Sequence, residues 1–298
     1  METTIVSYVL FWVCIVGLCF GSFFNVVILR SLSNESIVFP ASKCPKCGNA
    51  LKPWHNIPLL SYLFLRGKCA FCKEKISLQY PVVEFLTMLL FAFSFLKFGF
   101  SWKTLFAITL SSCMLIMTMT DLKEKLVDCN IAIGLAVVGF FFNWLVCENM
   151  LDSIYGLLLG VVIMEILARI GFLFSKGRAF GEADTYIAGA LGACFGITGL
   201  LYILVYSLLA SMIFIIPMFL HKQYKNNNKF LCIMFILFIL SALVFKILIQ
   251  NWWSLSFLIV FGMIVIVLTL KNLREDMSPL CLPLVPAFTM GALYFLFF

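Results

Sequence analysis

The chain has 298 residues, of which 63% are hydrophobic and only 12% are charged, and its mean hydropathy is +1.08. This composition excludes an ordinary water-soluble domain, because lipid but not water accommodates so much apolar surface. The net charge of +7 is carried largely by the loops between apolar segments. We therefore interpret it as a signal of membrane topology, with the lipid bilayer and no nucleic acid as the expected partner.

Apolar segments that are long enough to span a bilayer, or nearly so, recur from one end of the chain to the other. They predict an all-α polytopic membrane protein with about ten transmembrane helices. The first segment lacks the basic start and the cleavage site of a signal peptide, so we expect it to remain as a helix. The predicted segments are 5–29, 82–98, 102–120, 129–147, 151–174, 184–196, 198–219, 230–249, 252–271 and 280–298.

Basic residues set the predicted orientation of these helices. Of the 21 lysines and arginines, only Lys97 and Lys103 lie at segment ends on one side of the predicted membrane. Arg169 and Lys246 lie within predicted helices, and all the others lie in loops or at segment ends on the opposite side. The positive-inside rule assigns that opposite side to the cytoplasm, so we expect both termini to be external.

Three zones follow from this pattern: a first transmembrane helix (1–29), a polar cytoplasmic module (30–80) and a helical membrane bundle (81–298). The module contains two double-cysteine motifs, which together provide four thiolates at the spacing of a tetrahedral zinc site. Because the module is rich in turn-forming residues and poor in apolar ones, we expect a structural zinc ion to stabilise its fold. The predicted ligands are Cys44, Cys47, Cys69 and Cys72.

Two aspartates lie at the predicted cytoplasmic membrane edge. Asp121 directly follows the segment 102–120, and Asp184 begins the segment 184–196. Two carboxylates that are close together in a partly dry site share a proton, so that one acts as a general base on water and the other as an acid. This is the chemistry of aspartic proteases. The alternative is that each aspartate only terminates a helix at the interface.

The residues before Asp184 form a candidate substrate loop, in which Gly181 allows a close approach of the backbone and Glu182 and Ala183 complete the turn. Two further sites are candidates for supporting roles. Glu165 and Arg169 share one helical face, either as a helix-stabilising pair or as an electrostatic contact near the aspartates. Glu84, at the start of its helix, is open to the same two interpretations.

These residues lie in segments that resemble the bacterial type IV prepilin peptidase family, whose members are membrane aspartic proteases with a Gly-x-Gly-Asp motif. The similarity extends over nearly the whole chain and keeps the order of the family's segments. Residues 120–122 resemble the part that carries the first catalytic aspartate, and 181–184 resemble the part that carries the second. The other matching segments are 21–30, 56–63, 66–69, 79–87, 190–193 and 283–291.

The resemblance implies a bifunctional enzyme of the bacterial inner membrane. Such an enzyme removes the short basic leader of type IV prepilins or pseudopilins at the cytoplasmic face, with Asp121 and Asp184 as catalytic residues, and then methylates the new amino terminus. S-adenosylmethionine is the implied methyl donor. The chain contains no glycine-rich Rossmann motif, so methyl transfer rests on the resemblance alone and no residue is assigned to this cofactor.

The chain departs from the family pattern at several points. Ala183 replaces the second glycine of the motif, Tyr186 stands where lysine is common, and Asp128 with Cys129 stands where Pro-Asp or Pro-Asn is common. Residues 230–271 are predicted to be an inserted pair of helices. Ala183 also supports a second class, a membrane scaffold without peptidase activity. A third class is a transporter or channel in which the aspartates carry protons, although such groups usually lie near the middle of the membrane.

Overall fold

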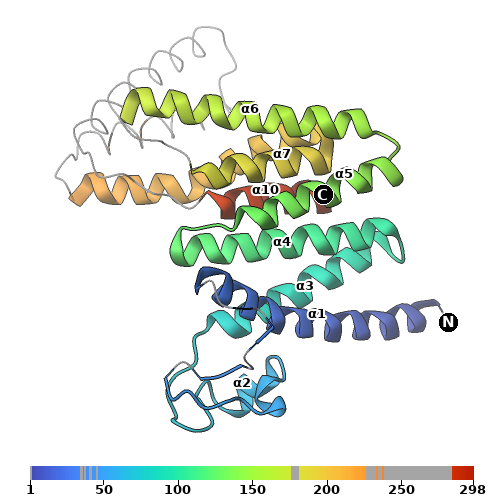
Figure 1. Ribbon diagram of the computed structural model, residues 1–298, viewed down its shortest axis with the longest axis vertical. Helices are drawn as coiled ribbons and strands as arrows, with labels where there is room; N and C mark the ends of the chain where they lie inside the picture. Colours follow the sequence, from blue (N-terminus) through green and yellow to red (C-terminus); the bar gives the residue numbers. More distant parts are fainter. Residues whose placement is uncertain are drawn as a thin grey trace. The chain divides into compact units, whose positions relative to one another are not determined.

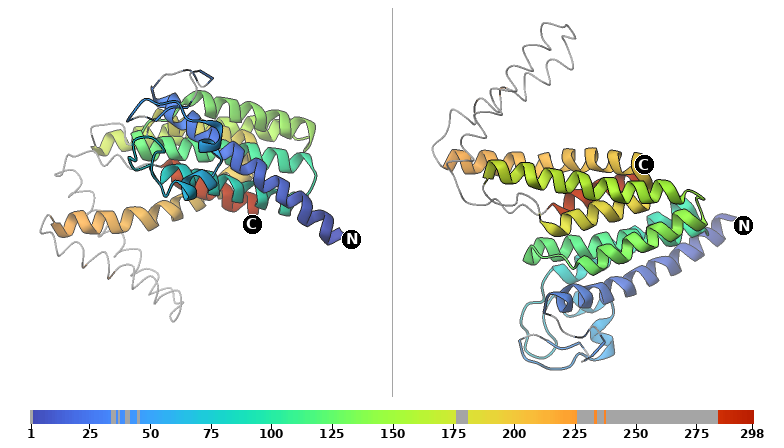
Figure 2. Two further views of the ribbon diagram at one scale, coloured as in Figure 1. Left: turned by 90° about the horizontal axis from the view of Figure 1, so that it is seen from below. Right: turned by 45° about the horizontal axis from the view of Figure 1, so that its top comes forward.

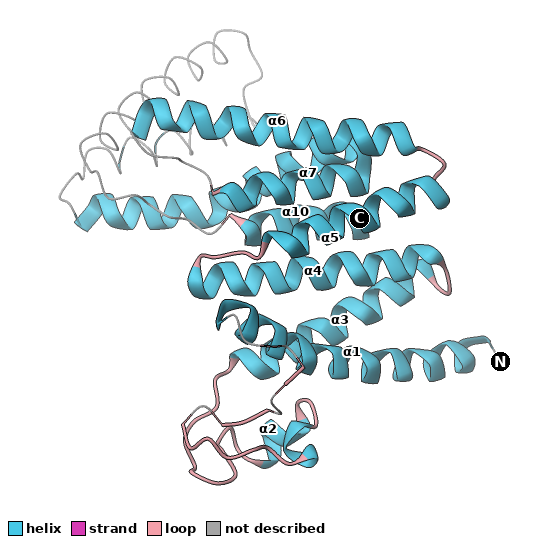
Figure 3. Cartoon of the chain, viewed as in Figure 1, coloured by secondary structure: helices cyan, strands magenta, loops and turns pink. Residues whose placement is uncertain are grey.

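The computed structural model describes residues 2–33, 36, 38, 39, 42–44, 46–175, 181–225, 233, 237 and 284–298. Across these residues the protein consists of helices and loops and contains no strand (Figure 3), which confirms the all-α class. The elements are α1 (Glu2–Ser33), the short 3-10 helix η1 (Pro53–Asn56), α2 (Leu60–Phe64), α3 (Gln79–Phe98), α4 (Trp102–Glu124), α5 (Cys129–Leu145), α6 (Met150–Ser175), α7 (Glu182–Lys225) and α10 (Val285–Phe297).

The chain divides into two compact units. Unit 1 comprises Met1–Val162, Glu182–Ser207 and Pro283–Phe298, and unit 2 comprises Ile163–Gly181 and Leu208–Leu282. All four cysteines of the predicted metal site and both candidate catalytic aspartates belong to unit 1. In this unit α4, α5 and α10 run side by side (Figures 1 and 2).

The helix boundaries agree with most of the predicted segments to within a few residues. The first helix extends to Ser33 and not to residue 29, and α4 extends to Glu124 and not to residue 120, so that Asp121 lies inside α4. The predicted segments 184–196 and 198–219 both fall within α7, whose backbone is non-helical at Gly196. The predicted segments 230–249 and 252–271 lie outside the described residues, apart from two isolated positions, so the number of ten helices stays a prediction.

Five of the described helices are long and apolar enough to cross a membrane. They are Thr4–Ser31, Gln79–Phe98, Trp102–Glu124, Met150–Arg169 and Glu182–Ser211, and the shorter apolar helices are Cys129–Leu145 and Val285–Phe297. The outer face of α1 exposes large apolar side chains, including Phe11 at 59% and Trp12 at 49% of their surface. Lipid is the solvent in which such exposure is favourable, so these helices indicate a multi-pass membrane protein.

Helix α4 is the centre of unit 1 and carries Asp121. In the most apolar 18-residue stretch of α4, 61% is buried, whereas the corresponding share for α1 is 28%. It begins at Ser101, whose side-chain oxygen accepts a hydrogen bond from the Thr104 backbone N–H, and this N-cap fixes where the helix starts. Residues from three helices, α1, α3 and α4, form the buried apolar cluster at its side: Phe24, Ile28, Val83, Leu115 and Ile116.

The break in α7 is supported by side chains of α5 and α6. Gly196 has φ of +69°, a backbone conformation that glycine adopts without strain. The carbonyl oxygen of Ala193 accepts hydrogen bonds from Asn143 Nδ2 at 2.8 Å and from Ser153 Oγ at 2.6 Å. On the other side of the break, the Ile197 N–H donates to Asp152 Oδ1 at 3.1 Å. The polar backbone groups freed by the break therefore have partners, as an apolar environment requires.

Candidate active site and metal centre

The four cysteines of the module form one cluster. The sulfur atoms of Cys44, Cys47, Cys69 and Cys72 all lie within 4.8 Å of one another. Cys44 Sγ and Cys72 Sγ are 3.9 Å apart, close to the roughly 3.8 Å between sulfurs that share a tetrahedral zinc at about 2.3 Å. All four cysteines are free rather than disulfide-bonded. The predicted ligand set is therefore brought together, and it could hold a metal ion.

The two double-cysteine motifs have the same backbone hydrogen bonds. In the first, Cys44 N donates to Asn49 O and Gly48 N donates to Cys44 O. In the second, Cys69 N donates to Glu74 O and Lys73 N donates to Cys69 O. Gly48 and Lys73 are equivalent positions, and both have positive φ, +70° and +60°. Each motif is thus a tight turn that directs two sulfurs to the same point.

The pKa values of Cys69 and Cys72 are both shifted by their surroundings, in opposite directions. Hydrogen bonds from the backbone of Cys72 and Phe71 lower the pKa of Cys69 to about 7. A hydrogen bond from the backbone of Glu74 lowers the pKa of Cys72, but desolvation and the neighbouring thiols outweigh it and raise that pKa to about 11. The Cys72 thiol therefore keeps its proton near neutral pH unless a positive ion compensates the negative charge.

Glu84 joins the cysteine module to the helices. It lies in α3, is only 7% exposed, and its Oε2 accepts a hydrogen bond from the Leu59 N–H at 2.8 Å. Leu59 precedes α2 in the module and has φ of +57°, an unusual value for a leucine. The start of α3 is in turn joined to α1, because Asn25 Nδ2 donates a hydrogen bond to Tyr80 O at 3.1 Å. The hydrogen bond with Leu59 therefore indicates a structural role for the Glu84 carboxylate, between α3 and the module.

Asp121 is buried and tied to the last helix. It is 7% exposed, and its Oδ2 accepts a hydrogen bond from the Val285 N–H at 3.2 Å. Val285 is the first residue of α10, so the carboxylate lies at the positive end of that helix. Thr118 Oγ1 and Thr289 Oγ1, 2.6 Å apart, join the same two helices. One oxygen of Asp121 is therefore held in place by the N-terminus of α10.

Asp184 lies in the first turn of α7 and is 8% exposed. Gly181 directly precedes the helix, and Glu182 and Ala183 are its first two residues. Figure 1 shows the end of α4 and the starts of α5, α7 and α10 at the same end of unit 1. Two buried carboxylates thus lie near helix ends at one end of the unit, and their position at the membrane edge stays a prediction.

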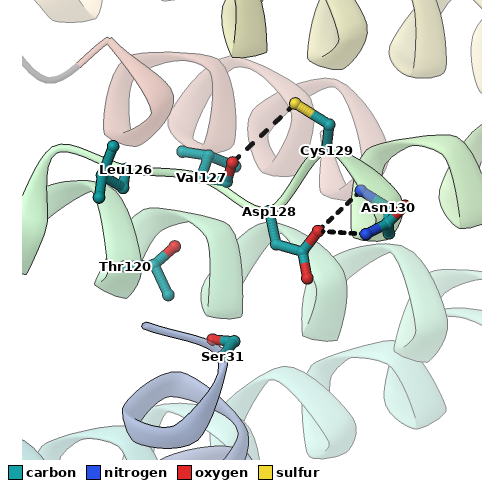
Figure 4. Close-up of a pocket in the computed structure, with 7 residues that line it drawn as sticks. All are labelled: Ser31, Thr120, Leu126, Val127, Asp128, Cys129 and Asn130. Carbon is teal, nitrogen blue, oxygen red and sulfur yellow. Dashed lines mark hydrogen bonds between the residues drawn. The ribbon is translucent and has the colours of Figure 1, made fainter. Parts of the chain in front are cut away.

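A pocket of about 380 Å³ lies next to the end of α4, and its lining includes Thr120 but not Asp121. The end of α1 contributes Ser31, α4 contributes Thr120, and the following loop and the start of α5 contribute the rest (Figure 4). Asp128 is the N-cap of α5, with Oδ1 accepting from Asn130 N and Asn130 Nδ2, both at 2.9 Å. The lining residues are Ser31, Thr120, Leu126, Val127, Asp128, Cys129 and Asn130.

The remaining predicted pair, Glu165 and Arg169, lies in unit 2. Arg169 Nε donates a hydrogen bond to Glu165 Oε1 at 3.2 Å. The Arg169 side chain is 80% exposed and the Glu165 side chain is 40% exposed. An exposed ion pair between residues four apart on a helix contributes less than about 0.5 kcal/mol. The geometry therefore matches a helix-stabilising pair, and a role near the aspartates stays a prediction.

Sequence reasoning missed the Val285 N–H and the pocket. Pro286 near the start of α10 is a signal for a helix N-terminus, but nothing in the local pattern indicates that this terminus faces Asp121. Ser31 and Thr120 are ordinary helix residues in the sequence. Only the packing of three helices makes them pocket residues.

The fold and these sites define a multi-pass helical membrane protein with a four-cysteine module and two buried carboxylates near helix ends. The model of the Bacterial Peptidase A24 N-terminal domain matches residues 15–98, which include the cysteine cluster and Glu84. The model of the Type IV leader peptidase family matches residues 108–216, which include Asp121 and Asp184. The chain belongs to the type IV leader peptidase family.

Curated relatives carry the name prepilin leader peptidase/N-methyltransferase. The protein of Neisseria gonorrhoeae is 32% identical over 229 residues, covering 68% of this chain and 80% of the relative. The Myxococcus xanthus protein is 34% identical over 65% of this chain, and the match spans 58% of that relative. The Bacillus subtilis protein is 37% identical over 54% of this chain and 60% of its own length. No solved structure gives a significant match.

Proposed function

We propose that this protein is a membrane aspartic endopeptidase that removes the leader of type IV prepilins or pseudopilins. The observation that carries the proposal is the pair of buried carboxylates, Asp121 and Asp184, at one end of unit 1. The matched family region contains both residues, and the curated relatives are named for the same reaction. The site faces the cytoplasm of a bacterial inner membrane, because the basic loops lie on that side.

The reaction requires one carboxylate to be ionised and the other to be protonated. The ionised group removes a proton from water, whose oxygen attacks the carbonyl carbon of the scissile peptide bond. The protonated group donates its proton to the carbonyl oxygen. Collapse of the tetrahedral intermediate breaks the C–N bond, and the leaving nitrogen takes up a proton, so that one water is consumed. The Val285 N–H fixes the orientation of Asp121 during these transfers.

The four cysteines hold a structural zinc ion in this proposal. Four protein thiolates fill a tetrahedral coordination shell and leave no open position for substrate, which is the pattern of structural rather than catalytic zinc. Methylation of the new amino terminus is the second activity, because the relatives are named N-methyltransferases. S-adenosylmethionine is the expected source of the methyl group, and the new terminal amine is its acceptor.

Co-expression with candidate prepilins in a strain without its own peptidase tests the function. We expect the mature chain to lose its leader and to gain the mass of one methyl group at its amino terminus, both read by mass spectrometry. Leader loss without the added mass would remove the methyltransferase assignment only. An intact leader with every pilin tested, despite normal membrane insertion, would favour the scaffold for which Ala183 is the sequence signal.

A further inference from the structure

We propose that Thr118 and Thr289 are positioning residues for Asp121. Their hydroxyl groups fix the register of α10 against α4, and this register sets the place of the Asp121 carboxylate. The proposal rests on the peptidase function and adds two residues to those on which that reaction depends. They act through Val285, whose N–H donates to Asp121 Oδ2 at 3.2 Å. Figure 1 shows α4 and α10 side by side.

Asp121 takes the place of a capping side chain at the start of α10. The first N–H groups of a helix have no partner within the helix and usually bond to a nearby polar side chain. Leu284, at the N-cap position, provides no such bond, and Pro286 has no N–H group. The Val285 N–H donates to Asp121 of another helix instead. The position of the carboxylate therefore depends on where α10 begins relative to α4.

A chain of hydroxyl hydrogen bonds ends at the same residue, Val285. Thr289 Oγ1 lies 2.9 Å from Val285 O and 3.4 Å from Met114 O, so the shorter bond takes its single hydrogen. Thr118 is then the donor in the 2.6 Å contact between the two threonine hydroxyls. Val285 is thus held at its carbonyl through the threonines and at its N–H by Asp121.

These bonds form two rungs between the helices. Thr118 and Asp121 are three residues apart on α4 and therefore lie on one face of it. Val285 and Thr289 are four residues apart on α10, again on one face. They are only 1% and 8% exposed, and hydrogen bonds shielded from water are stronger than exposed ones. A slide of α10 along α4 would lengthen both rungs at once.

Helix α7 limits the opposite side of α10. Gly291 lies two residues after Thr289 and therefore nearly opposite to it on the helix. A Cβ atom at Gly291 would lie 2.7 Å from Ile203 O and 3.0 Å from Ser207 N, so the two backbones are already in contact. Helix α10 has no room to move farther toward α7. Displacement along its own axis is the freedom that remains, and the threonine hydroxyls oppose it.

Two substitutions at position 289 separate the hydroxyl from the shape of the side chain. Thr289→Val replaces the hydroxyl by a methyl group and keeps the branched shape, whereas Thr289→Ser keeps the hydroxyl and loses the methyl group. A packing role predicts that the serine variant is slower, because it leaves a small cavity. Positioning through the hydrogen bond predicts that the valine variant is slower. The matched control is Thr109→Val, since Thr109 Oγ1 donates to Leu105 O within α4.

The experiment measures kcat and KM for a prepilin that the wild type cleaves, with purified enzyme in proteoliposomes. In Thr289→Val and in Thr118→Val we expect kcat to fall about tenfold with KM almost unchanged, because a misplaced carboxylate slows the chemical step and not substrate binding. Thr289→Ser should stay close to the wild type, and Thr109→Val should match it. The double valine variant should be no slower than either single one, because both substitutions remove the same bond.

Several outcomes overturn the proposal. Equal kcat in Thr289→Val and the wild type, or a serine variant slower than the valine variant, removes the role of the hydroxyl. A valine effect on KM alone shows a part in substrate binding. A fall in kcat that disappears when rates are divided by the fraction of protease-resistant enzyme shows a stabilising role only. Normal cleavage by every threonine variant refutes this proposal alone, whereas no cleavage of any prepilin by the wild type refutes the peptidase function itself.

Discussion

The cysteine module and the aspartate end of unit 1 are built in opposite ways. The four sulfur atoms come from one short stretch, and two turns with the same hydrogen bonds bring them together. The aspartate end joins residues that are far apart in the chain. The hydrogen bond between Asp121 and Val285 spans 164 positions of sequence. Local turns therefore bring together the two cysteines of each motif, whereas the aspartate end depends entirely on the packing of helices.

The two regions also differ in what stabilises them. The module exposes large apolar side chains such as Trp54 and Phe64, at 60% and 82%, and contributes few buried ones. We therefore expect its stability to come largely from the proposed zinc ion. The helices around Asp121 bury an apolar cluster and need no ion to pack. Damage to one region should therefore leave the other largely intact.

The largest effect should follow removal of the metal ligands. In Cys44→Ser with Cys69→Ser we expect loss of stoichiometric zinc, because structural zinc sites contribute about 10 kcal/mol or more to folding of small modules. Elemental analysis measures the zinc, and limited proteolysis should now cut within residues 40–75. Cys14→Ser in α1 is the control, since Cys14 lies outside the cluster. Retained zinc in the double variant would contradict the site.

The sequence predicted the module better than the aspartate end for the same physical reason. The spacing of Cys44, Cys47, Cys69 and Cys72 specifies their proximity, because a short turn admits few conformations. Apolar runs likewise specified where helices lie. Val285 could not be assigned to Asp121, because the contact depends on how α10 packs against α4. The break of α7 at Gly196 had a sequence signal, a glycine between two apolar segments, but its partners Asp152 and Asn143 had none.

A smaller effect should follow when the hydrogen bond that joins the module to α3 is removed. Glu84→Ala leaves the Leu59 N–H without its acceptor, which costs about 1–3 kcal/mol when the group is buried. We expect faster hydrogen exchange of the Leu59 amide, measured by mass spectrometry of the intact protein, while zinc remains bound. Glu84→Gln keeps an acceptor oxygen and should exchange nearly as the wild type does. Equal exchange in the alanine variant and the wild type would break the proposed link.

The smallest effects should distinguish the two cysteine turns. Gly48→Ala forces a side chain into positive φ and should weaken zinc retention roughly fivefold, equivalent to about 1 kcal/mol. Lys73→Gly relieves the same strain in the second turn and should strengthen retention by a smaller factor. Competition with a chelator measures both. A weaker site in Lys73→Gly would show that the two turns are not equivalent.

The most direct test of the central claim is cleavage by the two aspartate variants. Asn cannot ionise, so Asp121→Asn and Asp184→Asn should each abolish leader removal, and the double variant should be no worse, because the pair acts as one unit. Protein level, membrane insertion and zinc content should match the wild type, and Glu124→Gln should still cleave. Robust leader removal by either single variant, in cells that lack another prepilin peptidase, would contradict the account.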